Sequence, residues 1–274
     1  KRRYDSIMAA HPKTFDTLII GAGLLGSSTA YHLARMGAKN IAVVDADLAG
    51  LLSSSELNAG GARATWDQDI NVQLARESIR FLAENPEITG YRPCGYLWMW
   101  DPSKWDSALH RVKFLKQKHG IDVDVLSVKA LQEKTPFIDK TEDLAGATFS
   151  PLDGLFNPNL LKNYLRDEAR KLGVEFLEGH RVKAVALPKA DHVELTCELI
   201  PPKNESELKD FYESDPAVPQ KASGQTQTLT GKFLVNAAGP WAARMAKLIG
   251  YESPVFPVRR QVSIFDVRGL RVAS

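Results

Sequence analysis

A glycine-rich turn between two apolar segments constrains the fold of this chain more than any other feature of its sequence. The first apolar segment, residues 15–20, runs directly into Gly21-Ala22-Gly23-Leu24-Leu25-Gly26. A helical stretch follows, and a second apolar segment at 41–44 ends in Asp45. Strand, glycine turn, helix, strand and acidic residue in this order predict a βαβ unit with two parallel strands. We therefore expect an α/β fold that begins with this unit.

The residues of this unit have the properties that a dinucleotide site needs. Gly21 permits a sharp turn, Gly23 leaves room for a diphosphate beside the backbone, and Gly26 lets the helix pack closely on the strand. The N-terminal end of the helix presents free N–H groups and a positive dipole to phosphates. Asp45 accepts hydrogen bonds from a ribose 2′-hydroxyl and repels a 2′-phosphate, which favours FAD or NAD over NADP. The alternative is a glycine-rich turn that binds no ligand.

Composition and charge argue against several other classes of protein. The 274 residues are 44% hydrophobic and 25% charged, which is typical of a globular protein. A net charge of +2 does not indicate nucleic-acid binding, and no apolar run is long enough to span a membrane. Cys94 and Cys197 form neither a disulfide framework nor a metal-ligand spacing. We therefore expect no metal site and an intracellular setting, with cytoplasm and mitochondrion both open.

Two later segments share the small residues of the glycine turn. Ser, Asn and Gly are frequent in residues 53–61, just before Arg63, and supply hydroxyl groups, N–H groups and permissive dihedral angles. Residues 235–241, Val-Asn-Ala-Ala-Gly-Pro-Trp, form a second strand–turn–helix signal. Such segments let the backbone approach a flat ligand closely, but they also occur as surface loops and packing turns. The residues alone leave both interpretations open.

The glycine turn, Val44-Asp45, the Ser- and Gly-rich segment and residues 235–241, in this order, resemble the D-amino-acid oxidase and sarcosine/glycine oxidase superfamily of FAD-dependent oxidoreductases. The Gly-Gly-x-Arg form at 60–63 is most similar to the branch holding the sarcosine oxidase β subunit and the mitochondrial FAD-dependent oxidoreductase domain-containing proteins. The resemblance extends from residue 15 to 267. It implies an α/β fold: a Rossmann-like FAD/NAD(P)-binding domain with an interleaved α+β substrate domain built on an antiparallel sheet.

The resemblance also implies how the chain divides into domains. Residues 13–90 form the first part of the FAD-binding domain and residues 91–152 the first part of the substrate domain. Residues 153–250 return to the FAD-binding domain, with a flexible polar insertion at about 201–227. Residues 251–274 begin the second part of the substrate domain. Because family members continue beyond this point, and the chain does not open with Met, we expect a truncated fragment that lacks the C-terminal part.

Individual residues acquire roles from the same resemblance. Arg63 is the candidate for holding a substrate carboxylate or placing charge beside the flavin, with a surface or structural arginine as the alternative. Arg259 and Arg260 are weaker candidates. No histidine lies between His32 and His110 to carry flavin covalently, so FAD is expected to bind non-covalently. Val182 is expected to contact the adenine through its backbone. The expected cofactor-binding residues are Gly21, Ala22, Gly23, Leu24, Leu25, Gly26, Asp45, Ala46, Ser53, Ser54, Ser55, Asn58, Ala59, Gly60, Gly61, Val182, Ala238, Gly239 and Trp241.

The implied reaction is oxidation of the C–N bond of a small amine or amino acid, such as sarcosine, glycine or a D-amino acid. A hydride passes to flavin N5, and O₂ or an electron-transfer protein then accepts the electrons. One alternative is a non-catalytic flavoprotein that acts as an assembly or scaffold factor for mitochondrial respiratory complexes. Another is an NAD-linked dehydrogenase, against which the 235–241 segment argues because it belongs to the FAD pattern.

Four further elements are expected from the sequence. Asp101-Pro102 begins a helix that runs through His119, with Pro102 at an acceptable first-turn position. Residues 67–84 read as a helix that packs through Ile70, Leu74, Phe81 and Leu82. The aromatic strand at 91–100 is expected to form sheet core rather than a substrate-stacking cage. Residues 233–237 read as a buried strand.

Overall fold

The computed structural model describes residues 13–50, 53–200, 224–258 and 262–263. The chain divides into two units. The first unit comprises Lys1–Asn58 and Pro158–Arg259, and the second comprises Ala59–Asn157 and Arg260–Ser274. The first unit is therefore assembled from two separate stretches of chain, which flank the Ala59–Asn157 stretch of the second unit in the sequence.

A four-stranded parallel sheet lies at the centre of the first unit. Its strands are β2 (Thr17–Ile20), β3 (Ile41–Val44), β9 (Glu175–Leu177) and β13 (Phe233–Asn236), in the spatial order β13-β2-β3-β9. All three pairings are parallel. β2 and β3 are fully buried, as expected for parallel strands covered on both faces.

An antiparallel layer covers one face of this sheet. It contains β10 (His180–Lys189), β11 (His192–Leu199) and β12 (Thr226–Gly231), with β1 (Lys13–Thr14) parallel to β12 at its edge. The two layers share one apolar core. Its buried members are Phe15, Leu18, Ile20, Ala42, Val44, Val185, Val193, Leu195, Cys197 and Leu229.

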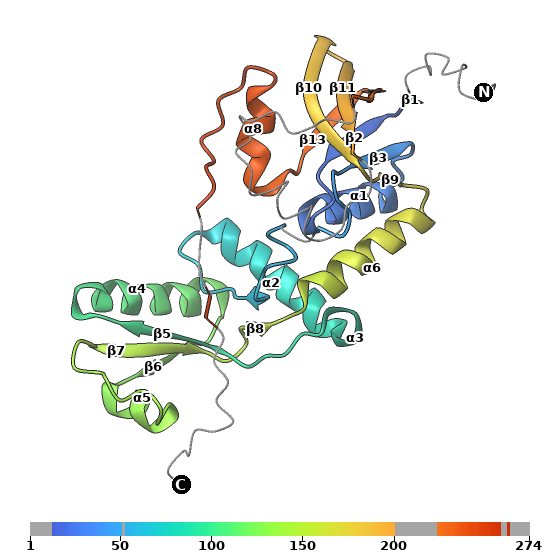
Figure 1. Cartoon of the computed structure of the whole chain (residues 1–274). Helices are drawn as coiled ribbons and strands as arrows, with labels where there is room; N and C mark the ends of the chain where they lie inside the picture. Colours follow the sequence, from blue (N-terminus) through green and yellow to red (C-terminus); the bar gives the residue numbers. More distant parts are fainter. Residues whose placement is uncertain (1–12, 51–52, 201–223, 259–261, 264–274) are drawn as a thin grey trace, which may run out of the picture. The chain divides into compact units, whose positions relative to one another are not determined.

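The two long helices of the first unit pack against each other. α1 (Leu24–Arg35) follows the glycine turn and contacts β2 and β3, and α6 (Pro158–Lys171) packs along α1 (Figure 1). Strand alternation places Ile19 and Val43 on the sheet face opposite Leu18. β13 continues into the 3-10 helix η1 (Gly239–Trp241) and the short helix α8 (Ala242–Lys247).

The second unit is built on a separate antiparallel sheet. β7 (Gly146–Ser150) lies between β5 (Tyr96–Trp100) and β6 (Asp124–Leu126), and a small ladder joins β4 (Gly61–Ala62) to β8 (Gly154–Leu155). In the β5–β7 register Tyr96 faces Ser150, Trp98 faces Thr148 and Trp100 faces Gly146. The aromatic residues 96, 98 and 100 therefore share one face of the sheet.

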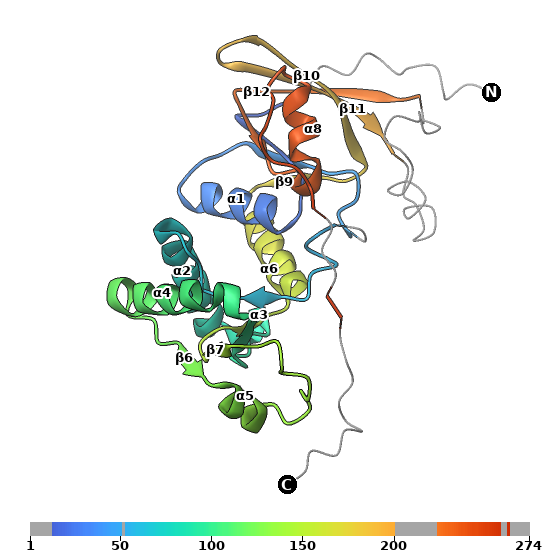
Figure 2. The same ribbon diagram turned by 90° about the vertical axis from the view of Figure 1, so that its left-hand side faces the viewer.

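Four helices belong to this unit (Figure 2): α2 (Asp69–Glu84), α3 (Pro86–Thr89), α4 (Pro102–His119) and α5 (Val128–Lys134). α4 begins where the Asp101-Pro102 sequence predicts it, because the Asp101 carboxylate accepts a hydrogen bond from the Ser103 N–H and Pro102 occupies the first turn. It ends at Gly120, whose left-handed conformation is typical of a helix terminus.

The packing face of α2 is only in part the one expected from the sequence. Leu82 is buried and Phe81 half-buried, as expected, whereas Ile70 and Leu74 are 58% and 61% exposed and Val72 is fully buried instead. Val72 packs with residues of α4 and the loop after it, together with half-buried Ala75 and Ile79. A helix with apolar residues at 70, 72, 74, 75 and 79 offers two possible stripes, and tertiary contacts select the second.

The expectation that β13 is buried is also wrong. Phe233 is 67% exposed and Asn236 is exposed, because within the described residues β13 pairs with β2 alone and forms an edge of the sheet. Residues 256–258 have no regular secondary structure. Arg259, Arg260 and residues 201–223 of the expected insertion lie outside the described residues. The domain boundaries at 90/91 and 152/153 stay predictions, since the two units divide at 58/59 and 157/158.

Candidate functional site

The glycine turn joins β2 to α1 in the first unit with a geometry that excludes side chains at two positions. Gly21 has φ +99°, and a Cβ there would overlap the Ala237 carbonyl. A Cβ on Gly26 would overlap the Gly21 carbonyl oxygen. Gly23 differs from both, because its φ of −64° suits any residue and a Cβ there would lie 3.2 Å from the Ser55 Oγ alone. Gly21 and Gly26 are thus required by packing, whereas a Cβ on Gly23 would meet no backbone atom and only the Ser55 side chain.

Asp45 follows β3 and is tied to the glycine turn. Its Oδ2 accepts a hydrogen bond from the Ala22 N–H at 2.6 Å, and its Oδ1 accepts one from the Asp47 N–H at 3.0 Å. Burial raises the pKa of this carboxyl group, while the two backbone N–H groups and the nearby Arg166 oppose that shift. A carboxylate accepts about four hydrogen bonds, so Asp45 retains capacity for a ligand hydroxyl. Ala46, the next residue, is half-buried.

One residue of the Ser-rich segment reaches the start of α1. Ser55 Oγ accepts a hydrogen bond from the Leu24 N–H at 2.9 Å, so its own hydroxyl hydrogen remains available to a second partner. Ser53 Oγ instead accepts from the Glu56 N–H within the segment. Ser54 and Asn58 are exposed, as is Leu25 in the first turn of α1.

The second strand–turn–helix segment meets the glycine turn at the sheet edge. The Ala237 N–H donates to the Ile20 carbonyl, Gly239 has φ +52°, and Trp241 ends η1. Ala238 packs on the core between the two sheets. β2, β3 and β13 thus bring the glycine turn, Asp45 and Ala238 together at their carboxyl ends, the place where ligands bind in parallel α/β sheets. Val182 lies on β10 opposite Cys197 and packs against the same core.

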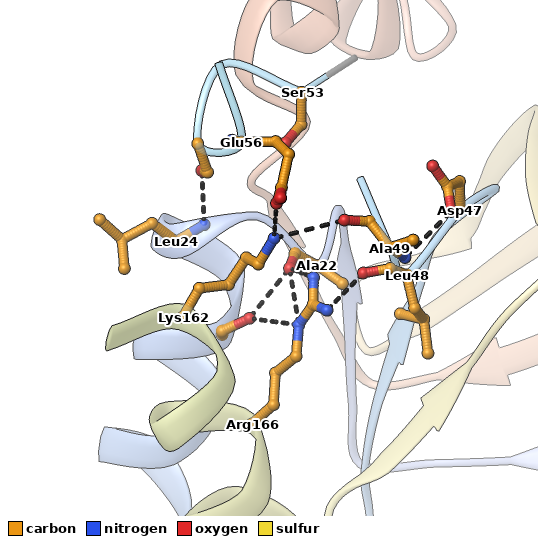
Figure 3. A network of polar contacts seen from close by, with 11 residues as sticks. Ala22, Leu24, Asp47, Leu48, Ala49, Ser53, Glu56, Lys162 and Arg166 are labelled. Atoms are coloured by element: carbon orange, nitrogen blue, oxygen red, sulfur yellow. Dashed lines mark hydrogen bonds and ion pairs between the residues drawn. The ribbon is translucent and has the colours of Figure 1, made fainter. Parts of the chain in front are cut away.

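Two cationic side chains of α6, Lys162 and Arg166, contact the glycine turn and the loop after β3 (Figure 3). Neither was expected from the sequence. Arg166 donates through Nε and Nη2 to the Ala22 carbonyl, through Nε to Ser27 Oγ and through Nη1 to the Leu48 carbonyl. Lys162 forms an ion pair with Glu56. The signal available in the sequence was their i, i+4 spacing in register with buried Leu161 and Leu165, which puts both on the packing face of the helix.

The second unit holds the remaining candidates. Ala59, Gly60, Gly61 and Arg63 all fall in it. Gly60 is buried with φ +79°, and a Cβ on Gly61 would overlap the Tyr96 hydroxyl group. Ala59 is exposed.

The Arg63 guanidinium lies against three aromatic rings. Its Cζ is 4.5 Å from the ring centroid of Trp66, 4.9 Å from that of Trp98 and 5.9 Å from that of Tyr96. Within the part of the chain that the structure describes, its N–H groups have no hydrogen bond and no ion pair. Cation–π contacts occupy the faces of a guanidinium and leave its edge of N–H donors for an anion. We call Arg63 with these three rings the arginine shelf.

Asp153 anchors the loop that carries Arg63. Its carboxylate is buried and accepts hydrogen bonds from the Ala64 N–H at 2.9 Å and the Thr65 hydroxyl at 3.2 Å. Burial raises the pKa of Asp153, and these hydrogen bonds and the Arg63 charge oppose the rise. Asp153 was also missed from the sequence, where Asp153-Gly154 reads only as a turn.

Comparison with known proteins decides the family. A family profile described as "FAD dependent oxidoreductase" (DAO) matches residues 16–273. The chain belongs to this FAD-dependent oxidoreductase family. The resemblance inferred from the sequence motifs is therefore confirmed, as is FAD rather than NAD as the cofactor of the family.

Individual relatives of this DAO-family chain agree with the profile. FAD-dependent oxidoreductase domain-containing protein 1 from Bos taurus is 30% identical over 254 residues, which cover 87% of this chain and 50% of that protein. Mitochondrial dimethylglycine dehydrogenase from Homo sapiens is 27% identical over 268 residues, covering 93% of this chain and 27% of that protein. The chain thus spans half or less of these relatives.

Solved structures show the same fold. The crystal structure of L-proline dehydrogenase from P. horikoshii superposes with a TM-score of 0.67 at 18% identity, covering 88% of this chain and 57% of that one. This confirms the expected α/β class with a Rossmann-like domain. Within the described residues, no helix combines the length and apolar composition that crossing a membrane requires. The same residues contain no group of three His, Cys, Asp or Glu side chains placed to bind a metal ion.

Proposed function

We propose that the first unit binds FAD non-covalently at the carboxyl ends of β2, β3 and β13. The single observation that carries this proposal is the turn at Gly23 beside the N-terminal end of α1, where a Cβ would meet no backbone atom and only the Ser55 Oγ, at 3.2 Å. A diphosphate fits such a cradle because backbone N–H groups and the helix dipole favour an anion. The proposed contacts in this unit are Gly21, Ala22, Gly23, Leu24, Leu25, Gly26, Asp45, Ala46, Ser53, Ser54, Ser55, Asn58, Val182, Ala238, Gly239 and Trp241. Ala59, Gly60 and Gly61 fall in the second unit and stay predictions.

The residues of the cradle divide the work of binding. Asp45 accepts hydrogen bonds from the ribose through the lone pairs that Ala22 and Asp47 leave unused. Ser55, fixed by the Leu24 N–H, donates its hydroxyl hydrogen to a phosphate oxygen. Val182 offers backbone groups to the adenine. When bound, FAD supplies the acceptor for a hydride.

We further propose that the protein oxidises the C–N bond of a small amine that carries a carboxylate. The support from the structure is the arginine shelf, in which Arg63 keeps its donor edge for a carboxylate while Trp66, Tyr96 and Trp98 fix its plane. A carboxylate held by Arg63 would fix the orientation of the substrate, and FAD, when bound, would supply the acceptor for the hydride that oxidation of the C–N bond to C=N releases. The name of dimethylglycine dehydrogenase, a relative at 27% identity, supports this substrate class.

The electron acceptor, O₂ or an electron-transfer protein, and the compartment, cytoplasm or mitochondrion, stay predictions. Because the chain spans half of FAD-dependent oxidoreductase domain-containing protein 1, activity of the whole protein is part of the proposal.

The test is anaerobic reduction of the FAD-loaded protein by sarcosine, glycine, proline and a D-amino acid, each compared with its decarboxylated amine. The Arg63→Met variant should raise KM for a carboxylate substrate about 30-fold, as loss of a charge-assisted bidentate contact predicts. It should leave the decarboxylated amine unaffected. The control is Arg80→Met, which removes an exposed arginine of α2. Equal losses on both kinds of amine would remove Arg63 as the carboxylate holder.

The scaffold alternative predicts a different result in the same experiment. A protein that retains FAD and is reduced by none of these amines would favour an assembly factor without turnover. Rapid reduction by any of them would exclude that alternative.

A further inference from the structure

We propose that Lys162 and Arg166 are electrostatic positioning residues of the proposed cofactor site (Figure 3). Their positive charges compensate the carboxylates of Asp45, Asp47 and Glu56. A diphosphate can then bind at the glycine turn without contacting either cation. The inference rests on the proposed FAD site. It assigns these two residues of α6 a part in cofactor affinity, and hence in setting how binding depends on the charge of the ligand.

Both side chains are buried, which requires an explanation. Lys162 is 2% exposed and Arg166 is 6% exposed. A buried cation is strongly unfavourable unless it is paired and hydrogen-bonded. Residues 162 and 166 lie one turn apart on α6 and both extend toward the same loop (Figure 3).

Lys162 compensates one acidic side chain. Its Nζ pairs with the Glu56 carboxylate and lies 3.4 Å from the Ala49 carbonyl oxygen. Glu56 follows Ser55 directly, and Ser55 Oγ is bonded to the Leu24 N–H at the start of α1. The Glu56 charge is therefore one residue from a proposed phosphate contact. Without Lys162 it would be a poorly solvated negative charge beside an anion site.

Arg166 compensates the other side of the cradle. Its guanidinium donates to the Ala22 and Leu48 carbonyls, and it interacts electrostatically with Asp45, Asp47 and Glu56. Ala22 is part of the glycine turn, so a full positive charge lies directly behind the proposed diphosphate position. This charge adds to the dipole at the N-terminal end of α1.

The charge balance shows why the cations matter. The loop carries three carboxylates, those of Asp45, Asp47 and Glu56, against the two cations of α6. One net negative charge remains, whereas the loop without the cations would present three. Repulsion between such charges and a diphosphate is large in a partly buried site and falls off over a Debye length of about 8 Å in solvent. A cradle that uses Asp45 for the ribose therefore needs cations nearby.

If Lys162 and Arg166 only held the loop in place, their removal would affect ligand binding differently than if they compensate charge. Loosening the loop would weaken every ligand of the site, charged or not. Removing a compensating charge would weaken ligands in proportion to their negative charge. Adenosine, AMP and ADP share the same base and ribose and differ in charge, so they separate the two effects.

The experiment measures competition of ADP, AMP and adenosine against FAD bound to the purified protein, by flavin fluorescence. Lys162→Met should weaken ADP about tenfold, AMP less, and adenosine hardly at all. The neutral pair Lys162→Met with Glu56→Gln should return ADP affinity to near the wild-type value. Glu56→Gln alone should reverse the sign and tighten ADP relative to adenosine, which keeps the test informative if Lys162→Met does not fold. Lys171→Met removes an exposed lysine of the same helix and should change nothing.

Two outcomes overturn the inference. The first is equal loss of adenosine, AMP and ADP in Lys162→Met, and the second is ADP affinity that Glu56→Gln leaves unchanged or weakens. A wild-type protein that binds neither FAD nor ADP would instead overturn the proposed function, and this inference with it.

Discussion

One arginine in each unit is held by well-defined contacts. The two arginines differ in how many of their N–H donors remain for a ligand. Arg166 in the first unit directs its donors to backbone carbonyls of Ala22 and Leu48 and to Ser27. Arg63 in the second unit rests on three aromatic rings. Among the described residues, it has no partner for its N–H groups. We therefore expect the first arginine to stabilise the fold, and we propose that the second binds an anion.

Residues that stabilise the structure of a site differ from residues that contact its ligand. A cation whose hydrogen bonds are satisfied internally contributes to folding and to the local field. A cation held by its faces contributes little to folding but keeps its donors for a ligand. The predictions below test this distinction, beginning with the largest effect.

Replacing each arginine by methionine should affect stability very differently. Arg166→Met leaves the Leu48 carbonyl without the Arg166 donor, the Ala22 carbonyl with the Ser27 hydroxyl group as donor, and Asp45 without its neighbouring cation, so it should lower the free energy of unfolding by about 3 kcal/mol. Arg63→Met loses only cation–π contacts and should cost about 1 kcal/mol. Urea denaturation followed by circular dichroism measures both.

Arg170→Met is the matched control on α6, because Arg170 is half exposed, pairs with exposed Asp167 and contacts one ring, that of Phe176, at 5.0 Å. It should change the free energy of unfolding by about 0.5 kcal/mol or less. Equal destabilisation by Arg166→Met and Arg63→Met would contradict the distinction between the two arginines.

Asp45 should contribute strongly to cofactor affinity. Asp45→Ala removes the proposed ribose acceptor and should weaken FAD by about 1.5–3 kcal/mol. Fluorescence titration gives the dissociation constant, with Asp167→Ala on the exposed face of α6 as the control. An unchanged dissociation constant would show that Asp45 does not hold the ribose.

The pH dependence of FAD binding follows from the raised pKa of Asp45. A carboxyl group whose folded pKa lies above its unfolded value of about 3.9 stabilises the ligand-free protein at acid pH, and this contribution is lost as pH rises through the folded pKa. FAD binding to the ionised carboxylate should have the opposite trend and weaken as pH falls through the raised pKa. Titrations at a series of acidic pH values should show this for the wild type and a flatter profile for Asp45→Asn. Identical profiles would contradict it.

The smallest effect concerns the arginine shelf. A double-mutant cycle of Arg63→Met and Trp98→Leu should give a coupling free energy of about 0.5–1 kcal/mol, as expected for one cation–π contact. Denaturant unfolding of the four proteins measures it. Additive effects would mean that the ring does not hold the guanidinium.

The sequence predicts the backbone of the cofactor cradle because its constraints are local. Spacing alone identifies Gly21 and Gly26, whose Cβ atoms would overlap neighbouring backbone, and Asp101-Pro102 predicts the start of α4. Family resemblance adds residues 235–241, which reach the same sheet edge. These features depend on dihedral angles and short spacings that a sequence displays directly.

Side-chain partners were less predictable because they join distant parts of the chain. Lys162 and Arg166 contact a loop more than a hundred positions earlier, and Asp153 contacts Ala64 across 89 positions. The aromatic strand was expected to form sheet core, and only the structure brings Arg63 onto Tyr96 and Trp98. The predictions that Ile70 and Leu74 of α2 pack in the core and that β13 is buried were wrong for the same reason. Burial depends on which neighbours cover an element.

The central claim is that the turn at Gly23 forms a cradle for the diphosphate of FAD, and titration of the wild type and Gly23→Val with FAD tests it most directly. A side chain at position 23 suits the backbone dihedral angles, and its Cβ would lie near no atom but the Ser55 Oγ, at 3.2 Å, so Gly23→Val should keep the wild-type circular dichroism and lower the unfolding midpoint only slightly. The wild type should bind FAD and release it unmodified on denaturation, whereas Gly23→Val should bind it at least about tenfold more weakly. Equal FAD affinity in the two proteins, or none in the folded wild type, would contradict the claim.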